Sequence, residues 1–256
     1  MCPGNTSGLS DAHTEQPGLA GRRAVITGGT TGIGRAIAVL LASYGVKIFT
    51  CGRTPEHLQD ALKRIREVGE GDGMNVDLSR AEGVDRFFDS ATTYLGGIDI
   101  AIINAAVPAE ALEDASEQDT RYQLETDLVA YIVTAQEAAR KMQAGSDIIL
   151  IGSMSAVSRK GGHSIYVAAK SGVQGFAVAL RQELSEKDIK VGLIEPGFTG
   201  ADFQYPDFPP ERQRESIHQH RMLRAEDIAV ATHFMLTQPR RTAVSLIRIE
   251  PRLEHP

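Results

Sequence analysis

The residues RAVITGGTTGIG, 23–34, carry the most information about the fold of this chain. Its first five residues form a short β-branched run that is typical of a buried strand. Gly28, Gly32 and Gly34 then stand in a turn, and the residues after the turn repeat their apolar positions at helical spacing. Such a turn can serve steric needs alone. Its place between a strand and a helix favours a dinucleotide site, because a pyrophosphate can approach the glycine backbone at the positive end of the helix.

Short apolar runs alternate with longer amphipathic stretches along the rest of the chain. This alternation is typical of βαβ units and predicts a single α/β domain with a doubly wound, seven-stranded parallel sheet, the NAD(P)-binding Rossmann fold. The domain is expected over residues 19–256, after a polar tail at 1–18. The expected strands are 23–27, 47–51, 73–76, 98–103, 147–151, 190–194 and 244–249. The expected helices are 33–44, 55–68, 80–95, 117–142, 164–186 and 226–237.

Composition excludes several classes of function. The 256 residues carry a formal net charge of −6 without a basic tract, which argues against nucleic acid and anionic membranes as partners. No apolar run approaches the roughly 20 residues of a membrane helix. Cys2 and Cys51 are too few for a disulfide framework, and the first residues do not resemble a secretory signal, so a cytoplasmic location is expected. His218 and His220 have no further ligand nearby in sequence, and no metal is expected.

The end of the second expected strand bears on the choice of cofactor. An Asp or Glu there would bind the adenosine ribose and repel a 2′-phosphate, whereas this chain has Cys51, Gly52 and Arg53. A guanidinium can grip a phosphate through two hydrogen bonds. The sequence therefore predicts a preference for NADP(H), with NAD(H) still possible. The alternative is that Arg53 stacks on adenine or lies in solvent.

The segment after the fifth expected strand contains a candidate catalytic group of three residues. Tyr166 and Lys170 are four residues apart and share one face of a helix. The lysine ammonium would favour the phenolate and so lower the pKa of the tyrosine from about 10. Ser153 stands at the carboxyl end of the strand, where it could donate to a substrate carbonyl while Tyr166 exchanges the proton. A serine at this point could instead form a turn or a helix cap.

Together, the TGxxxGxG turn, Ser153, the YxxxK pair of Tyr166 and Lys170, and Pro196-Gly197 resemble the compact branch of the short-chain dehydrogenase/reductase family. The resemblance covers residues from about 20 to 250. It implies an oxidoreductase that interconverts a ketone and a secondary alcohol, acting as a carbonyl reductase on a ketone or 3-oxoacyl substrate. It also implies a homodimer or homotetramer. Extended relatives that act on nucleotide sugars need a larger C-terminal domain than this chain has.

The resemblance assigns cofactor contacts residue by residue. Asn104, Ala105 and Ala106 match part of an Asn-Asn-Ala-Gly motif, with Ile103 in place of the first Asn. Asp77 matches an adenine contact, although it could equally cap the following helix. Lys170 is expected to bind the nicotinamide ribose as well. The expected cofactor-binding residues are Gly28, Thr30, Thr31, Gly32, Ile33, Gly34, Arg53, Asp77, Leu78, Asn104, Ala105, Tyr166, Lys170, Pro196, Gly197 and Thr199.

Two features depart from the family pattern. Asp127 stands where the family usually has an Asn that completes a catalytic tetrad through a water. Its backbone carbonyl could hold that water, its carboxylate could face Lys170 and raise the pKa of the lysine, or it could be an exposed helix residue without a catalytic part. The chain also ends in VSLIRIEPRLEHP rather than in a glycine-rich segment, so its terminus is expected to pack differently and the family tetramer is less firmly implied.

The long stretch at about 196–225 is predicted to be a substrate lid. It contains Phe198, Phe203, Tyr205 and Phe208, which either favour an apolar or ring-containing substrate or tether the lid to the domain. The expected substrate-pocket residues are Met154, His163, Phe198 and Phe203. The rival to an enzyme is a catalytically silent NADP(H)-binding sensor or interaction module.

Overall fold

The apolar runs pair into one parallel sheet with the strand order β3-β2-β1-β4-β5-β6-β7. The computed structural model describes residues 16–108, 111–200 and 208–253. The order reverses direction after β1, so the two βαβ halves diverge from a switch point between β1 and β4, as in dinucleotide-binding folds. The predicted fold class is confirmed. The strands are β1 Arg23–Thr27, β2 Lys47–Gly52, β3 Gly71–Asn75, β4 Ile98–Ile103, β5 Met142–Ile151, β6 Lys190–Pro196 and β7 Leu246–Ile249.

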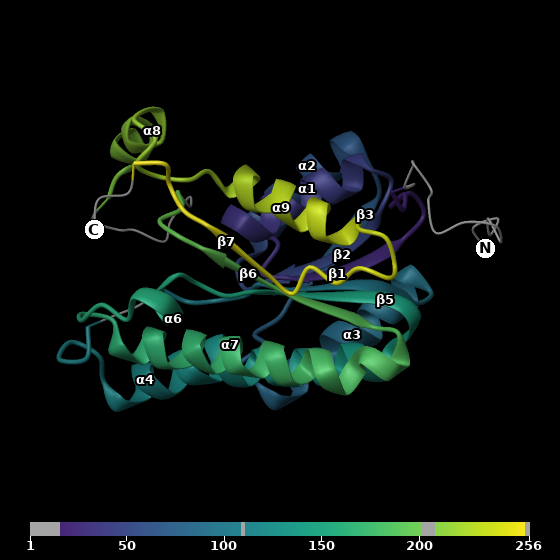
Figure 1. The fold of residues 1–256 in the computed structure, drawn as a ribbon, viewed down its shortest axis with the longest axis horizontal. Helices are drawn as coiled ribbons and strands as arrows, with labels where there is room; N and C mark the ends of the chain where they lie inside the picture. Colours follow the sequence, from purple (N-terminus) through teal and green to yellow (C-terminus); the bar gives the residue numbers. More distant parts are fainter. Residues whose placement is uncertain (1–15, 109–110, 201–207, 254–256) are drawn as a thin grey trace.

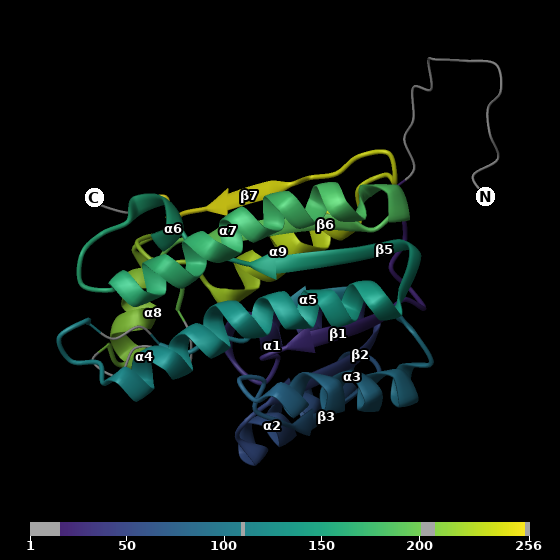
Figure 2. The same cartoon turned by 90° about the horizontal axis from the view of Figure 1, so that it is seen from below.

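Helices cover both faces of the sheet. In Figure 1, α1, α2 and α9 lie on one side of the sheet and α3 and α7 on the other, and Figure 2 shows α3, α5 and α7 in a row. Both faces of the central strands are thereby removed from water. The helices of eight or more residues are α1 Gly32–Ser43, α2 Pro55–Val68, α3 Ala81–Leu95, α4 Glu117–Leu124, α5 Ala130–Lys141, α7 Ser164–Leu184, α8 Pro210–His218 and α9 Ala225–Leu236. The single turn α6 spans Ser155–Ser158.

The hydrophobic core has two layers, one on each side of the sheet. Successive residues of a strand point to opposite faces, and β4 shows the alternation plainly. Ile100 and Ile102 belong to the layer under α1, α2 and α9. Ala101 and Ile103 belong to the layer under α3, α5 and α7. All four are buried, which is why this strand reads as a continuous apolar run.

Three elements differ by more than two residues from the sequence-based expectation. The strand β5 begins at Met142 rather than at 147, because Met142 already pairs with Ile98 before a register shift. The expected helix at 117–142 is interrupted by a π-helical turn, Glu125–Val129, between α4 and α5. The stretch expected to be irregular at about 196–225 contains α8, and Thr199 bridges to Leu223. A polar helix such as α8 has no strong apolar period to reveal it.

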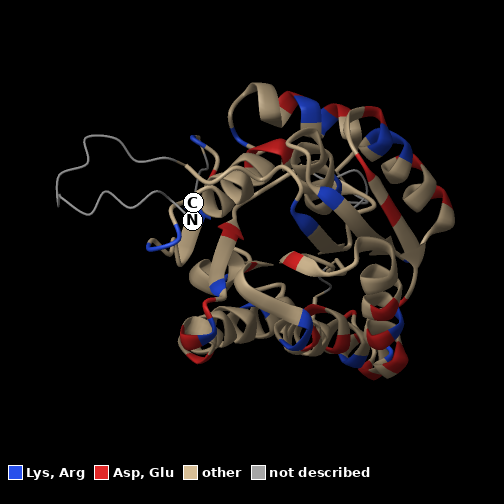
Figure 3. Cartoon of the chain, turned by 90° about the vertical axis from the view of Figure 1, so that its right-hand side faces the viewer, with Lys and Arg blue, Asp and Glu red and all other residues tan. Residues whose placement is uncertain are grey.

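Charged residues of both signs alternate along the outer helices (Figure 3). This pattern agrees with the mixed, mildly acidic surface expected from the net charge of −6. Within the described residues, no helix is both long and apolar enough to cross a membrane.

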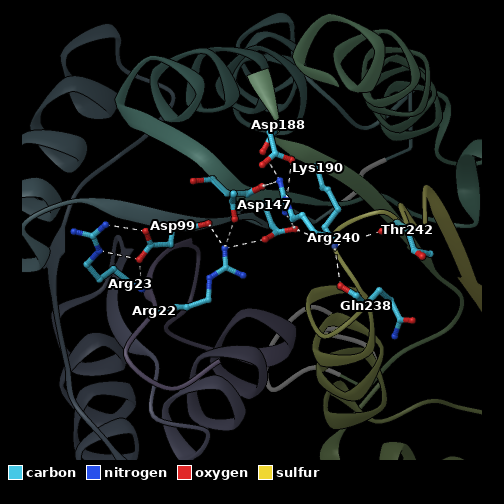
Figure 4. A network of polar contacts seen from close by, with 11 residues as sticks. Arg22, Arg23, Asp99, Asp147, Asp188, Lys190, Gln238, Arg240 and Thr242 are labelled. Atoms are coloured by element: carbon cyan, nitrogen blue, oxygen red, sulfur yellow. Dashed lines mark hydrogen bonds and ion pairs between the residues drawn. The ribbon is translucent and has the colours of Figure 1, made fainter. Parts of the chain in front are cut away.

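A polar network ties together the amino ends of the strands, at the edge away from the glycine turn (Figure 4). The buried carboxylate of Asp147 in β5 lies 2.8 Å from Arg22, 3.1 Å from Arg240 and 3.6 Å from Lys190. Asp99 in β4 pairs with Arg23 at 2.8 Å. The network therefore connects β1, β4, β5, β6 and the segment after α9.

Candidate active site

The glycine turn is shaped by close backbone contacts with the end of β4. Gly28 has a φ of +64°, and a Cβ on it would lie 2.7 Å from Ala105 Cα. A Cβ on Gly34 would lie 2.2 Å from the Gly28 carbonyl oxygen. Asn104 donates its side-chain amide to the carbonyls of Thr27 and Gly28, each at 3.1 Å. Only glycine fits these positions, so the turn brings the backbone and the start of α1 to an open edge.

A cavity of about 280 Å³ lies at this edge, where β1, β2, β3 and β4 end. It brings together the predicted cofactor residues of the first half of the chain: Gly28, Thr30, Thr31, Gly32, Ile33, Arg53, Asp77, Leu78, Asn104 and Ala105. Gly34 packs directly beneath them, against Gly28 and Asn104. Sequence reasoning missed several other lining residues: Thr54, His57, Val76, Val107, Pro108 and Thr126. Of these, Thr54 and His57 could have been suggested by their nearness to Arg53 in sequence.

Arg53 and Asp77 each have a protein partner in the structure. The exposed guanidinium of Arg53 donates to the Tyr122 hydroxyl and lies 5.6 Å from the centre of the Tyr122 ring. Asp77 accepts from the backbone N–H of Ser79 at 3.0 Å and from its hydroxyl at 2.8 Å. Asp77 therefore shapes the turn before α3, whereas Arg80 occupies the helix-cap position.

The three predicted catalytic residues lie around the carboxyl ends of β5 and β6. Ser153 stands two residues after the end of β5 and is half-buried, and its Oγ accepts from the Ser155 N–H at 3.1 Å. Tyr166 and Lys170 are one turn apart on α7, with Lys170 Nζ 5.6 Å from the centre of the Tyr166 ring. The spacing has placed these two side chains together, as predicted. Ser153 makes the turn-forming hydrogen bond that was the structural alternative to a catalytic role. In this bond the hydroxyl oxygen is the acceptor, so its O–H hydrogen is not used.

Pro196, Gly197 and Thr199 lie beside the serine segment. The backbone N–H of Met154 donates to the Pro196 carbonyl at 2.9 Å, continuing the pairing of β5 with β6 past the strand ends. Thr199 is buried, and its hydroxyl donates to the Gly197 carbonyl at 3.0 Å. The segment after β6 is therefore fixed next to Ser153.

Lys170 is buried, and its surroundings contain two further ionisable groups. Burial lowers the pKa of Lys170 to about 8, while the charge of Asp127 opposes this effect. Burial raises the pKa of Asp127 to about 6, with the Lys170 charge opposing. Asp127 lies in the π-helical turn with a relative exposure of 0%, so the alternative of an exposed helix residue is wrong. Its Oδ1 accepts from the Val107 N–H at 2.8 Å.

Tyr131 is a further site residue that the sequence did not reveal. Its hydroxyl accepts a hydrogen bond from Lys170 Nζ at 2.9 Å and donates to the Ile151 carbonyl at 3.0 Å. It lies 39 positions from Lys170 in sequence. A buried tyrosine on a helix reads as a core residue, and its spacing of four from Asp127 was the only available signal.

The predicted substrate residues are spread over three segments. Met154 is half-buried next to Ser153, and His163 is exposed just before α7. Phe198 packs against Phe208 with 5.8 Å between ring centres, which agrees with a tethering role. Phe203 and Tyr205 lie outside the described residues. Within those residues, no three His, Cys, Asp or Glu side chains gather as a metal site would require.

Comparisons with known proteins were consistent with this geometry. A family model described as short chain dehydrogenase matches residues 22–211. The chain is 29% identical to human (Homo sapiens) 3-oxoacyl-(acyl-carrier-protein) reductase over 84% of this chain and 90% of the relative. It is 31% identical to carbonyl reductase family member 4 of Danio rerio over 85% and 92%. A crystal structure of a short chain dehydrogenase from Burkholderia cenocepacia in complex with NADP is 27% identical, with a TM-score of 0.82 over 92% of this chain and 98% of that chain.

Proposed function

Because the chain belongs to the short-chain dehydrogenase/reductase family of oxidoreductases, we propose that it reduces a ketone to a secondary alcohol with NADPH. The observation that carries the proposal is the arrangement of Ser153, Tyr166 and Lys170 at the strand ends. These three residues lie at the edge of the sheet where ligands of open α/β folds bind.

The residues of the cavity fit a dinucleotide cofactor. The turn has no room for a Cβ at Gly28 or Gly34, so backbone N–H groups can reach a pyrophosphate directly. Thr31 makes no side-chain hydrogen bond to the start of α1, which leaves those donors for a ligand. Asp77, Leu78, Asn104 and Ala105 would enclose the adenosine half, and Pro196, Gly197 and Thr199 would hold the nicotinamide carboxamide. Bound NADPH supplies the hydride that the carbonyl carbon receives.

The protein side chains would manage the oxygen and its proton. The Ser153 hydroxyl donates to the carbonyl oxygen while the Tyr166 hydroxyl transfers its proton to the same atom. Lys170 stabilises the resulting phenolate by its charge. The carbon gains a hydride and the oxygen gains a proton, so the ketone becomes an alcohol and Tyr166 is reprotonated from solvent.

The preference for NADPH is proposed on the chemistry of Arg53. No carboxylate follows β2 to repel a 2′-phosphate, and the exposed guanidinium lines the cavity beside Thr54 and His57. The solved relative from Burkholderia cenocepacia was crystallised with NADP. Arg53→Met should raise the Kd for NADPH by about tenfold or more and leave that for NADH within about twofold. Fluorescence titration of the purified protein with each cofactor measures this change.

The substrate class is proposed to be a ketone or 3-oxoacyl thioester. Relatives of the chain carry the names 3-oxoacyl-(acyl-carrier-protein) reductase and carbonyl reductase. The test is to follow NADPH absorbance with a panel of ketones, 3-oxoacyl thioesters and cyclic diketones. Tyr166→Phe is the matched control, because it removes one oxygen. Turnover by the wild type and its loss in Tyr166→Phe would support the proposal.

A silent NADP(H)-binding module remains the second candidate, and the buried Asp127 in place of the family Asn favours it. Tight NADPH binding with equal inactivity of wild type and Tyr166→Phe across the panel would select this candidate. Asp127→Asn gives a further test of the two candidate functions. The substitution should change the pH–rate profile of an enzyme, whereas a binding module has no such profile.

Assembly is proposed on the exposed apolar side chains of two helices. The expected homodimer or homotetramer would pair the outer faces of α5 and α7, where Ile132 and Val178 are 37% and 52% exposed. Ile132→Glu with Val178→Glu should then shift the elution of the protein in size-exclusion chromatography toward a smaller species. A cytoplasmic location stays a prediction from the cysteine content.

A further inference from the structure

Lys170 belongs to the outer helix α7, but its ammonium group is buried and makes hydrogen bonds inside the protein. An ammonium has three N–H donors. One is directed to the Tyr131 hydroxyl at 2.9 Å and one to the Ile151 carbonyl at 3.3 Å. The third is left for the side of α7 that faces Tyr166, whose ring centre lies 5.6 Å from Nζ.

The Tyr131 hydroxyl can only act as an acceptor toward this ammonium. Its own hydrogen is donated to the Ile151 carbonyl at 3.0 Å, so an oxygen lone pair faces Lys170. Burial raises the pKa of Tyr131 well above its usual value, so the hydroxyl keeps its proton. Tyr131 is itself 1% exposed and reaches neither the cofactor cavity nor the surface. It is therefore a fixed, neutral support behind the lysine.

The π-helical turn explains why both Asp127 and Tyr131 face α7. A π-helical turn adds one residue to the helix and shifts the face presented after it. Asp127 in this turn is fully buried, and its Oδ2 has no hydrogen-bond partner among the described residues. A buried carboxylate oxygen without a partner is costly, unless a nearby positive charge offsets it. Lys170 provides that charge.

We propose that Tyr131 is a positioning residue of the proposed reaction. Its hydroxyl holds the Lys170 ammonium from the side away from Tyr166, so that one N–H points toward Tyr166. Asp127 is the buried counter-charge of the ammonium. The inference rests on the proposed function for its catalytic meaning. The hydrogen bonds that carry it belong to the cofactor-free protein and can be tested without turnover.

The charged groups around Lys170 determine the direction in which its pKa is shifted. Asp127 faces it from the π-helical turn, the neutral Tyr131 from α5 and Tyr166 from its own helix. Glu195 of β6 also packs toward α7, but it is engaged by Gln174 at 2.7 Å and by Arg248 at 2.8 Å. Burial lowers the pKa of Lys170 to about 8, and a hydrogen-bond acceptor on the ammonium works against that lowering.

Tyr131→Phe removes the acceptor and keeps the ring. The pKa of Lys170 should fall by about one pH unit, because a hydrogen bond to a charged group is lost. The fall of kcat at high pH should move to lower pH by the same amount, while KM for the ketone stays within about twofold because Tyr131 does not touch the pocket. Thr134→Val is the matched control: it removes a buried hydroxyl from the same helix that has no hydrogen-bond partner among the described residues.

The first measurement is the ¹³Cε NMR titration of Lys170 in the cofactor-free protein, with Lys170→Met to assign the signal. A lowered pKa in Tyr131→Phe, with Thr134→Val at the wild-type value, supports the inference. An unchanged pKa in Tyr131→Phe overturns it and reduces Tyr131 to a core residue. If Tyr131→Phe fails to fold, Tyr131→Met, a smaller and more flexible side chain that also lacks the acceptor, carries the same expectation.

The second measurement is the pH dependence of kcat, which separates this inference from the proposed function. A wild type that reduces no ketone refutes the function and leaves the NMR result to decide the contact. A lowered Lys170 pKa with an unshifted kcat profile refutes the positioning role. Asp127→Asn should lower the Lys170 pKa in the same direction, and the double variant should show less than the sum of the two shifts, because both act on one ammonium.

Discussion

Replacing Asp147 by Asn tests the polar network at the amino ends of the strands. Asp147 is buried, with a side-chain exposure of 3%, and Arg22, Arg240 and Lys190 all lie within 3.6 Å of its carboxylate. The amide keeps the shape and one acceptor oxygen but removes the negative charge. Three cations are then left around a neutral group inside the protein (Figure 4).

The expected cost follows from this burial. Removing one partner of a buried ion pair costs about 3–5 kcal/mol, and the remaining amide acceptor places Asp147→Asn near the lower value, about 3 kcal/mol. For a domain of this size each kcal/mol shifts the thermal midpoint by roughly 2–4 °C. We therefore expect the midpoint to fall by about 10 °C. The catalytic residues lie at the opposite ends of the strands, so kcat below the transition should stay within about twofold.

The assay is thermal unfolding followed by circular dichroism at neutral pH and a fixed scan rate. Asp89→Asn is the control: its carboxylate pairs with Lys141 at 3.3 Å but is 76% exposed, so its midpoint should stay within about 1 °C. Lys190→Met should cost less in the Asp147→Asn background than in the wild type, since the lysine has then lost its counter-charge. A midpoint for Asp147→Asn within about 2 °C of the wild type would refute the reasoning.

Two further predictions concern the site. Gly34→Ala should abolish NADPH binding without unfolding the protein, because the added Cβ would lie 2.2 Å from the Gly28 carbonyl oxygen. Gly175→Ala is the control, since a Cβ there meets open space, and this variant should bind NADPH normally in the same fluorescence titration. The thermal midpoint of the wild type should rise relative to that of Lys170→Met between about pH 8 and pH 10.5, because the folded-state pKa of Lys170, about 8, lies below its usual value of 10.5. The cost of burying the lysine charge is complete below pH 8 and gone above about pH 10.5, so a difference in midpoint that stays constant across that range would contradict the explanation.

The order of the elements and the local geometry of the site could be predicted from the amino-acid sequence. Apolar runs bounded by turns predict strands wherever a strand is buried on both faces, as in β4. The glycine turn and the YxxxK spacing are local too, since Gly28, Gly34, Tyr166 and Lys170 owe their places to one turn and one helix. The cofactor residues at the ends of β1 to β4 were assigned by the family resemblance, and they come together because parallel strands present their carboxyl ends at one edge of the sheet.

Contacts between side chains that are far apart in sequence could be found only in the folded structure. Tyr131 reaches Lys170 because α5 and α7 pack side by side after a π-helical turn, and no periodic pattern announces that turn. Arg53 meets Tyr122 across 69 positions, and Asp147 gathers cations that begin at Arg22 and end at Arg240. The physical reason is that hydrophobic periodicity reports which face of an element is buried, while the pairing of buried polar groups depends on distances between elements, which only their packing sets.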